Sequence, residues 1–155
     1  MISNEEQIKE IISKNLPGKT DISIKRQRRV LIKVSRTDLK KLMKILAKEL
    51  KAQHLSTITA RDTGTELEIL YHFFIQNVLV TVRTSCPRDD PTVDSIMDIF
   101  PSAVLYEREI NDILGIKPKG HPDLRRLILP DDWNQGFPLR KDWKQSGGDA
   151  IDKQG

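Results

Sequence analysis

Three histidines and one cysteine are the side chains in this sequence best suited to metal binding or nucleophilic chemistry. His54, His72 and His121 lie far apart, and none has a second histidine at the spacing that places two metal ligands on one face of a helix. Cys86 stands alone before a proline, which excludes an internal disulfide and a cluster held by four thiolates of this chain. The glycines follow no phosphate-binding pattern. We therefore expect no metal, no cofactor and no catalytic residue in this chain, and no activity of the chain alone.

The stretch 106–133, "YEREINDILGIKPKGHPDLRRLILPDDW", concentrates charge around a predicted helix. On that helix Glu107 falls at the edge of an apolar arc of about 100°. The arc is formed by Tyr106, Ile110, Ile113 and Leu114. The opposite side carries Leu105, Arg108 and Asp112. A carboxylate at the edge of the core needs a partner, so we expect Glu107 to form a clasp with Arg125 or Arg126, whose guanidinium groups match carboxylates.

Composition is typical of a single soluble domain. The chain has 155 residues, of which 37% are hydrophobic and 31% charged. No apolar run approaches the roughly 18 residues of a membrane-spanning helix. The amino-terminal stretch "MISNEEQIKE" is polar and acidic, unlike a secretory signal. These features favour a cytoplasmic setting.

Positive charge gathers in the first third of the chain. Residues 1–51 contain 14 Lys and Arg against 6 Asp and Glu, whereas residues 52–155 contain 12 against 16. The densest run is "KRQRR", Lys25 to Arg29. Such a run suits a nucleic-acid or anionic-membrane patch, but without neighbouring aromatic residues we favour a solvated turn between two strands.

Hydrophobic periodicity predicts an α+β domain with a mainly antiparallel sheet of about five strands and helices packed on it. Helical stripes and alternating strand patterns occupy residues 8–16, 21–25, 30–34, 39–50, 55–62, 67–75 and 78–84. Apolar residues on both faces of 67–75 predict a strand that is covered on both sides. Pro91 is expected to begin a short helix capped by Asp90. A further helix should run over 101–114 and end at Gly115.

The last part of the chain differs in kind from the rest. We divide the chain into a single α+β domain, 1–126, and an irregular, extended carboxyl-terminal docking arm, 127–155. The arm has little periodicity, yet it contains Trp133, Phe137 and Trp143. Aromatic residues need something to bury them against, either the arm's own domain or a partner protein. With the outward-pointing Leu105, they are the candidate partner-docking residues.

The same stretch resembles a known family. "YEREINDILGI", "GHPDLRRLILPDDW" and "PLRKDW" closely resemble the signature of the 30-kDa subunit family of respiratory complex I (NADH dehydrogenase) and of the related membrane-bound, energy-converting [NiFe] hydrogenases. "LSTITARDTG", "YHF" and "VTVRT" fit the same family, and the resemblance covers about residues 30 to 145. The signature falls on Glu107, Arg108, Glu109, Asp112, Gly115, Gly120, His121, Pro122, Arg125 and Arg126.

The resemblance implies a cofactor-free structural subunit in the hydrophilic arm of a membrane-bound, ion-translocating oxidoreductase. Its partners would be the large hydrogenase-like subunit, which the carboxyl-terminal arm embraces, and the small iron–sulfur subunit. Iron–sulfur clusters, or nickel and iron, would belong to those partners. The chain would be peripheral, on the cytoplasmic side of the membrane, and would contact the membrane only through the complex.

Two departures from the family pattern indicate a branch. Asn111 and Leu114 stand where complex I relatives look more aromatic, and "KPKG" precedes the His-Pro pair. Together with the short chain, they look more like the compact hydrogenase-type or archaeal-type members. The alternative function is a free-standing basic nucleic-acid-binding protein that uses Lys25 to Arg29. A stand-alone enzyme is a second rival, which bound metal or cofactor absorbance in the pure protein would favour.

Overall fold

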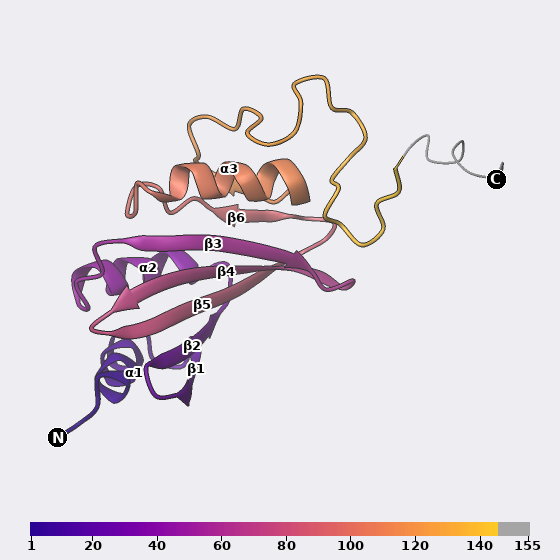
Figure 1. Ribbon diagram of the computed structural model, residues 1–155. Helices are drawn as coiled ribbons and strands as arrows, with labels where there is room; N and C mark the ends of the chain where they lie inside the picture. The colour runs from indigo at the N-terminus through magenta and orange to yellow at the C-terminus, as the bar shows by residue number, and fades with distance from the viewer. Residues whose placement is uncertain (146–155) are drawn as a thin grey trace, which may run out of the picture.

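A five-stranded sheet forms the centre of the protein (Figure 1). The computed structural model describes residues 1–145. The strands of this sheet are β1 Thr20–Arg26, β2 Arg29–Val34, β3 Leu55–Asp62, β4 Glu66–Ile75 and β5 Val78–Pro87. Their order is β1-β2-β5-β4-β3, with β2 and β5 parallel and the other neighbours antiparallel. The fold class expected from the sequence, a mainly antiparallel sheet with helices packed on it, is confirmed.

Short turns determine most of the strand order. The turn at 76–77 joins β4 to β5, and both of its residues, Gln76 and Asn77, have positive φ, as tight hairpins require. The basic run Lys25–Arg29 extends from the end of β1 into the start of β2, so it lies at a turn between two strands. Helix α2, Leu39–Lys48, then carries the chain away from β2 before the β3–β4–β5 meander begins.

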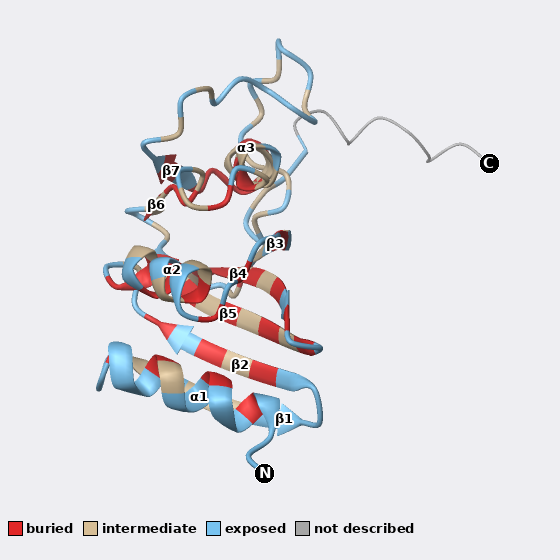
Figure 2. Cartoon of the chain, turned by 90° about the vertical axis from the view of Figure 1, so that its left-hand side faces the viewer, coloured by how far each residue is buried: buried red, intermediate tan, exposed pale blue. Residues whose placement is uncertain are grey.

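The helices cover one face of the sheet. α1, Asn4–Asn15, and α2 lie side by side on that face and direct their buried residues toward the strands (Figures 1 and 2). On β4 the alternate residues Leu67, Ile69, Tyr71, Phe73 and Ile75 are buried in the same core. Phe73 also contacts Phe100, with ring centroids 4.9 Å apart, so the segment that precedes the third helix packs on this face too.

The opposite face of the sheet lies open, which corrects an expectation. The sequence predicted that 67–75 would be covered on both sides, but Leu70 is only half-buried and Phe74 is 64% exposed. The apolar residues on both faces of β4 made the strand look fully buried. Within the described residues no helix covers this second face, because α1, α2 and Phe100 all pack on the first.

A small second sheet replaces the short helix expected at Pro91. Strand β6, Thr92–Asp94, runs parallel to β7, Lys117–Lys119. Backbone hydrogen bonds flank the pair, from Lys117 N to the Pro91 carbonyl at 2.7 Å and from Ser95 N to the Lys119 carbonyl at 2.8 Å. The helix prediction is wrong because these backbone groups find partners in a strand far along the chain, which local sequence signals do not show.

Helix α3, Ala103–Leu114, ends as the sequence predicts. Gly115 adopts a left-handed conformation with φ of 71°, and its N–H bonds to the last turn of the helix. The chain then turns back through β7 and over α3 (Figure 1). Nowhere in residues 1–145 does a helix have the length and apolar character needed to cross a bilayer.

Candidate functional site

Glu107 is buried on the inner side of α3 and does not form the expected clasp. It is 1% exposed. Its carboxylate accepts hydrogen bonds from the Ser95 hydroxyl at 2.6 Å and from the Ile96 backbone N–H at 2.8 Å. Burial raises the pKa of Glu107, and these two donors only partly oppose that effect. The predicted ion pair with an arginine is therefore corrected: Glu107 holds the loop before α3 against the helix.

Asp112 is the carboxylate that the downstream arginines meet. It lies on the outer side of α3 but is only 3% exposed, because the segment 126–129 crosses over it. Arg126 donates to it at 3.0 Å. The backbone N–H groups of Leu127, Ile128 and Leu129 donate at 3.2, 2.8 and 2.9 Å. Burial alone would raise the pKa of Asp112, but these donors outweigh it and lower the pKa.

Arg108, one helical turn before Asp112, completes the attachment of the crossing segment. Its guanidinium donates to the backbone carbonyls of Arg125 at 3.1 Å and of Arg126 at 2.9 Å. Arg108 thus satisfies carbonyl groups while Asp112 satisfies N–H groups of the residues that follow. A base at i, Arg108, and an acid at i+4, Asp112, thus bind the main chain of 125–129 together. We call this arrangement the α3 clamp.

The His-Pro turn attaches to the other end of α3. The His121 Nε2 atom lies 2.9 Å from the Val104 carbonyl, and Nδ1 lies 3.0 Å from the Asp123 N–H. Because a carbonyl can only accept and an N–H can only donate, these contacts select the neutral tautomer protonated on Nε2. Arg125 pairs with Asp123 at 2.8 Å on the surface.

Four of the predicted residues make no polar side-chain contact in this cluster: Glu109, and Gly115, Gly120 and Pro122, which have no polar side chain. Gly120 lies in the turn before His121 with φ of 86°, and Pro122 is exposed. Glu109 is half-buried, and the described part of the chain offers its carboxylate no hydrogen bond or ion pair. No group of three or more His, Cys, Asp or Glu residues within 1–145 is arranged to hold a metal ion.

The aromatic residues of the arm contact each other and the end of α3. Trp133 and Trp143 stack with centroids 6.1 Å apart. Phe137 lies against Gly115, where a Cβ atom would come within 2.5 Å of its ring. Arg140 lies over the Phe137 ring at 4.8 Å, and its Nε donates to the Leu114 carbonyl at 2.8 Å. The described part of the arm, up to residue 145, therefore folds back on its own domain and satisfies carbonyl groups at the carboxyl-terminal end of α3.

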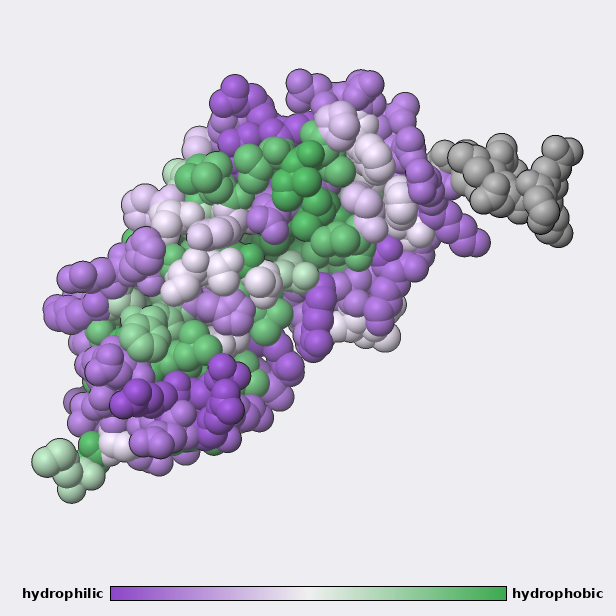
Figure 3. All heavy atoms as spheres, in the orientation of Figure 1, coloured by the Kyte–Doolittle hydropathy of each residue, from purple (hydrophilic) through white to green (hydrophobic). Residues whose placement is uncertain are grey.

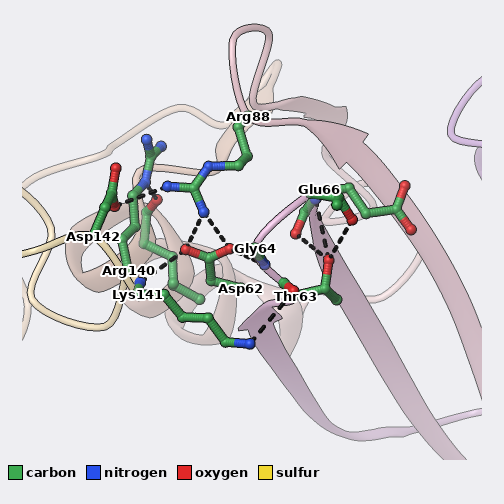
Figure 4. A network of polar contacts seen from close by, with 10 residues as sticks. Asp62, Thr63, Gly64, Glu66, Arg88, Arg140, Lys141 and Asp142 are labelled. Atoms are coloured by element: carbon green, nitrogen blue, oxygen red, sulfur yellow. Dashed lines mark hydrogen bonds and ion pairs between the residues drawn. The ribbon is translucent and has the colours of Figure 1, made fainter.

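Asp62 holds the arm at Lys141 (Figure 4). It accepts from the backbone N–H groups of Gly64 at 2.8 Å and Lys141 at 2.9 Å, and Arg88 pairs with both of its oxygens. Arg88 also pairs with Asp142 at 2.8 Å. Burial works to raise the pKa of Asp62, but the N–H and guanidinium donors lower it to about 2. Asp62 did not stand out in the sequence, since Arg88 and Lys141 lie far from it along the chain.

Apolar side chains remain exposed around the α3 clamp. Leu105 is 51% exposed and Ile128 is 56% exposed. We define the α3 patch as Leu105, Leu124, Leu127 and Ile128. Over α3 and the chain that crosses it, Figure 3 shows a hydrophobic area bordered by hydrophilic residues. By contrast Trp133, Phe137 and Trp143 are half-buried in intramolecular contacts.

Comparison with known proteins identifies the family. The family model described as "Respiratory-chain NADH dehydrogenase, 30 Kd subunit" matches residues 32–149. The chain belongs to this family. The resemblance to the 30-kDa subunit family noted in the sequence is thereby confirmed, and the matched range contains both the α3 clamp and the Asp62 network of Gly64, Arg88, Lys141 and Asp142.

Similar members of the 30-kDa family come from several kinds of complex. Membrane-bound hydrogenase subunit beta of Pyrococcus furiosus is 36% identical over 122 residues, which cover 75% of this chain and 70% of the relative. A subunit of the F(420)H(2) dehydrogenase of Methanosarcina mazei is 33% identical, with 75% and 76% covered. A subunit of the NADH-quinone oxidoreductase of Chloroherpeton thalassium is 37% identical, but the match spans only 41% of its length and 61% of this chain.

Solved structures agree with this assignment. A chain of the membrane-bound sulfane sulfur reductase, an archaeal respiratory membrane complex, superposes with a TM-score of 0.81 at 25% identity, covering 97% of this chain and 95% of that one. The trypsin-resistant fragment of Nqo5 shares the fold, with a TM-score of 0.63 at 23% identity, covering 77% and 98%. This chain is thus a subunit of a complex I-like or membrane-bound hydrogenase-like assembly.

The opposite pKa shifts of the two α3 carboxylates lead to a first prediction. The raised pKa of Glu107 means that the folded state favours the protonated form, so its contribution to stability is lost as pH rises above the ordinary value of 4.5. Glu107→Gln removes the charge; the amide oxygen can still accept from the Ile96 N–H, while the NH2 group donates to the Ser95 hydroxyl oxygen. Urea unfolding should show a variant at least as stable as wild type at neutral pH, with a flatter stability profile as pH rises from 4.5 toward neutral. A less stable variant at pH 7 would contradict this account.

Asp112→Asn should behave in the opposite way. An amide can no longer accept from all four donors, and each buried donor left unsatisfied costs about 1–3 kcal/mol. Urea unfolding should show a clear loss of stability, and hydrogen exchange should accelerate at the amides of Leu127, Ile128 and Leu129. Asp123→Asn is the matched control, because solvent screens its pair with Arg125 on the surface and the pair therefore adds little to stability. Equal effects of the two substitutions would argue against the clamp.

Gly115→Ala tests whether Phe137 lies on the helix end in the free chain. A side chain at this positive φ costs roughly 1–2 kcal/mol, and the clash with Phe137 adds to it. In a Phe137→Ala background only the backbone term should remain, so a double-mutant cycle on unfolding free energies should show coupling. Strictly additive costs would mean that the arm is undocked in solution.

Proposed function

We propose that this chain is a cofactor-free structural and assembly subunit in the hydrophilic arm of a membrane-bound, ion-translocating oxidoreductase, where it docks on the large hydrogenase-like subunit. The observation that carries the proposal is the α3 patch. Its apolar side chains stand exposed on α3 and on the crossing segment, whose main chain is held by hydrogen bonds from Arg108 and to Asp112. The buried carboxylates of the site, and its arginines, bind backbone groups. They hold the chain in place and leave the apolar side chains of the α3 patch at the surface.

Rigidity is what makes the α3 patch suitable for binding. Leu127 and Ile128 occupy an irregular segment, and such a segment alone loses about 1–2 kcal/mol of backbone entropy per residue when it is ordered. In this protein the α3 clamp meets that cost during folding, since Asp112 and Arg108 hold 125–129 in place. A partner therefore meets a preorganised apolar surface, and preorganisation strengthens binding.

The arm, 127–155, is proposed as the second part of the docking surface, attached to the domain 1–126. Residues 146–155 of the arm lie outside the described part of the structure. Trp133, Phe137 and Trp143 keep their proposed role as docking residues, through the faces that their mutual contacts leave accessible. Leu139, exposed beside the end of α3, adds an apolar contact that the sequence did not single out.

The further partner is proposed to be the small iron–sulfur subunit, with iron–sulfur clusters, or nickel and iron, held by the partner subunits. The chain would then lie on the cytoplasmic side of the membrane and reach the bilayer only through the complex. The match to the Pyrococcus furiosus hydrogenase subunit and the superposition on an archaeal respiratory complex support the hydrogenase-type or archaeal-type branch.

Substitution in the α3 patch should weaken assembly without unfolding the subunit. Leu105→Gln with Ile128→Gln removes two exposed apolar contacts, which should lower the yield of intact complex roughly tenfold while the melting temperature of the free subunit stays within a few degrees. Ile2→Gln, at an exposed apolar residue outside the patch, is the control. The measurement is co-purification of the other subunits with a tagged chain; unchanged co-purification would reject the proposed docking surface.

A chain shortened after Pro130 tests the contribution of the arm separately from that of the α3 patch. It keeps the α3 clamp but loses the contacts of Phe137, Arg140 and Lys141. We expect it to remain folded, with stability reduced by about 1–3 kcal/mol, and to co-purify poorly with the large subunit. Circular dichroism and co-purification measure these effects. Full assembly of the shortened chain would remove the arm from the proposal.

A further inference from the structure

Four paired residues form a row across the sheet at its end near the 76–77 turn. Arg26 on β1 pairs with Arg29 on β2, Arg29 pairs with Leu79 on β5, and Leu79 stands opposite Phe74 on β4. Phe74 and Leu79 each lie between two buried residues of their own strands, and Arg29 precedes a buried residue of β2. Because side chains alternate along a strand, these three project from the face that no helix covers.

Apolar residues extend this row into a patch. Leu31 on β2 pairs with Thr81 on β5, and Leu70 lies on β4, four residues before Phe74. Both are half-buried, whereas Phe74 is 64% exposed. In Figure 3 a second hydrophobic area, separate from the one over α3, lies over β4 and β5. An exposed phenylalanine with aliphatic neighbours on an otherwise well-formed sheet is typical of a binding surface.

The basic run borders this patch and forms no ion pair among the described residues. The backbone of Leu79 bonds to the Arg28 carbonyl at 2.9 Å, which fixes the run beside the patch. Lys25, Arg26, Arg28 and Arg29 are all exposed, and none forms an ion pair with the residues that the structure describes. The nearby carboxylate of Glu5 accepts the backbone N–H of Arg28 and leaves the guanidinium groups unpaired.

We propose that Phe74, Leu79, Leu31 and the basic run form a second docking site, for a protein segment of another subunit that carries an apolar side chain flanked by carboxylates. The apolar side chain would cover Phe74, and the carboxylates would meet Arg29 and its neighbours. The site is separate from the α3 patch. It rests on membership of a multi-subunit complex, which the family shows, and not on the proposed docking of the arm.

The composition of the face favours a protein over a nucleic acid. Single-stranded nucleic acids stack successive bases on aromatic rings. Among the described residues of this face Phe74 is the one Phe, Tyr or Trp, and its neighbours are leucines, which offer no planar ring. His72 is held by Thr59 and Thr81 on its two ring nitrogens, at 3.2 and 3.1 Å. A second copy of the chain is also disfavoured, because it would bring two basic runs together.

Site-specific crosslinking in the intact complex tests the proposal directly. p-Benzoylphenylalanine is placed at position 74 and, in a separate variant, at position 105 of the α3 patch. We expect position 74 to crosslink to a peptide of another subunit that has Asp or Glu beside the crosslinked residue. A crosslink to a peptide without acidic residues, to a second copy of this chain or to nucleic acid would overturn the proposal.

The result at position 105 distinguishes a failure of the second docking site from a failure of the proposed function. No product from position 74 together with a product from position 105 would overturn the second site and leave the proposed function intact. No product from either position would overturn the second site and also count against docking through the α3 patch.

Charge and apolar substitutions provide an independent readout. Phe74→Thr and Arg29→Glu should each weaken the attachment of this subunit to the purified complex roughly tenfold, so that it dissociates at lower salt concentration. Ile24→Thr and Lys9→Glu are matched controls at exposed positions outside the row, and should dissociate as wild type does. Wild-type salt resistance in both test variants would overturn the proposal.

Discussion

The buried carboxylate of Asp112 is the interaction on which the outer half of the molecule depends. A charged group with almost no exposure is costly unless donors surround it, and here the donors are one guanidinium and three consecutive backbone N–H groups. Because those N–H groups belong to an irregular segment, the carboxylate gains its hydrogen bonds only when that segment becomes ordered. The path of the chain over α3, and the apolar side chains it exposes, follow from that single requirement.

Two carboxylates on one helix thus have different roles because their surroundings differ. Glu107 faces the core, has two donors and is held with a raised pKa; Asp112 faces outward, has four and is held with a lowered pKa. The first attaches the loop before α3 and the second attaches the segment after it. Asp62 repeats the second arrangement at the end of the sheet, where it receives the main chain of the arm.

This use of polar residues suits a subunit of a larger assembly. The family signature supplies charges that would draw attention as catalytic groups, yet the structure commits most of them to backbone atoms of the same chain. Apolar side chains stay exposed on two surfaces: the α3 patch and the area around Phe74 on the open face of the sheet. In the structural role proposed for it within such a complex, the chain would contribute shape and contact area.

The sequence by itself determined the parts of the fold that depend on neighbours along the chain. Local geometry determines the helical stripes, the strand alternation, the 76–77 turn and the glycine that ends α3. The motif of the 30-kDa family can be recognised from the sequence alone. Only the tertiary structure decided that Pro91 leads into a strand, that Phe74 stays exposed, and that Asp112 rather than Glu107 receives Arg126. Helical periodicity gives the direction of a side chain from the axis, but it does not say which distant segment crosses there to bury it. Likewise, apolar residues on both faces of a strand do not show whether this chain, or another, supplies the second cover.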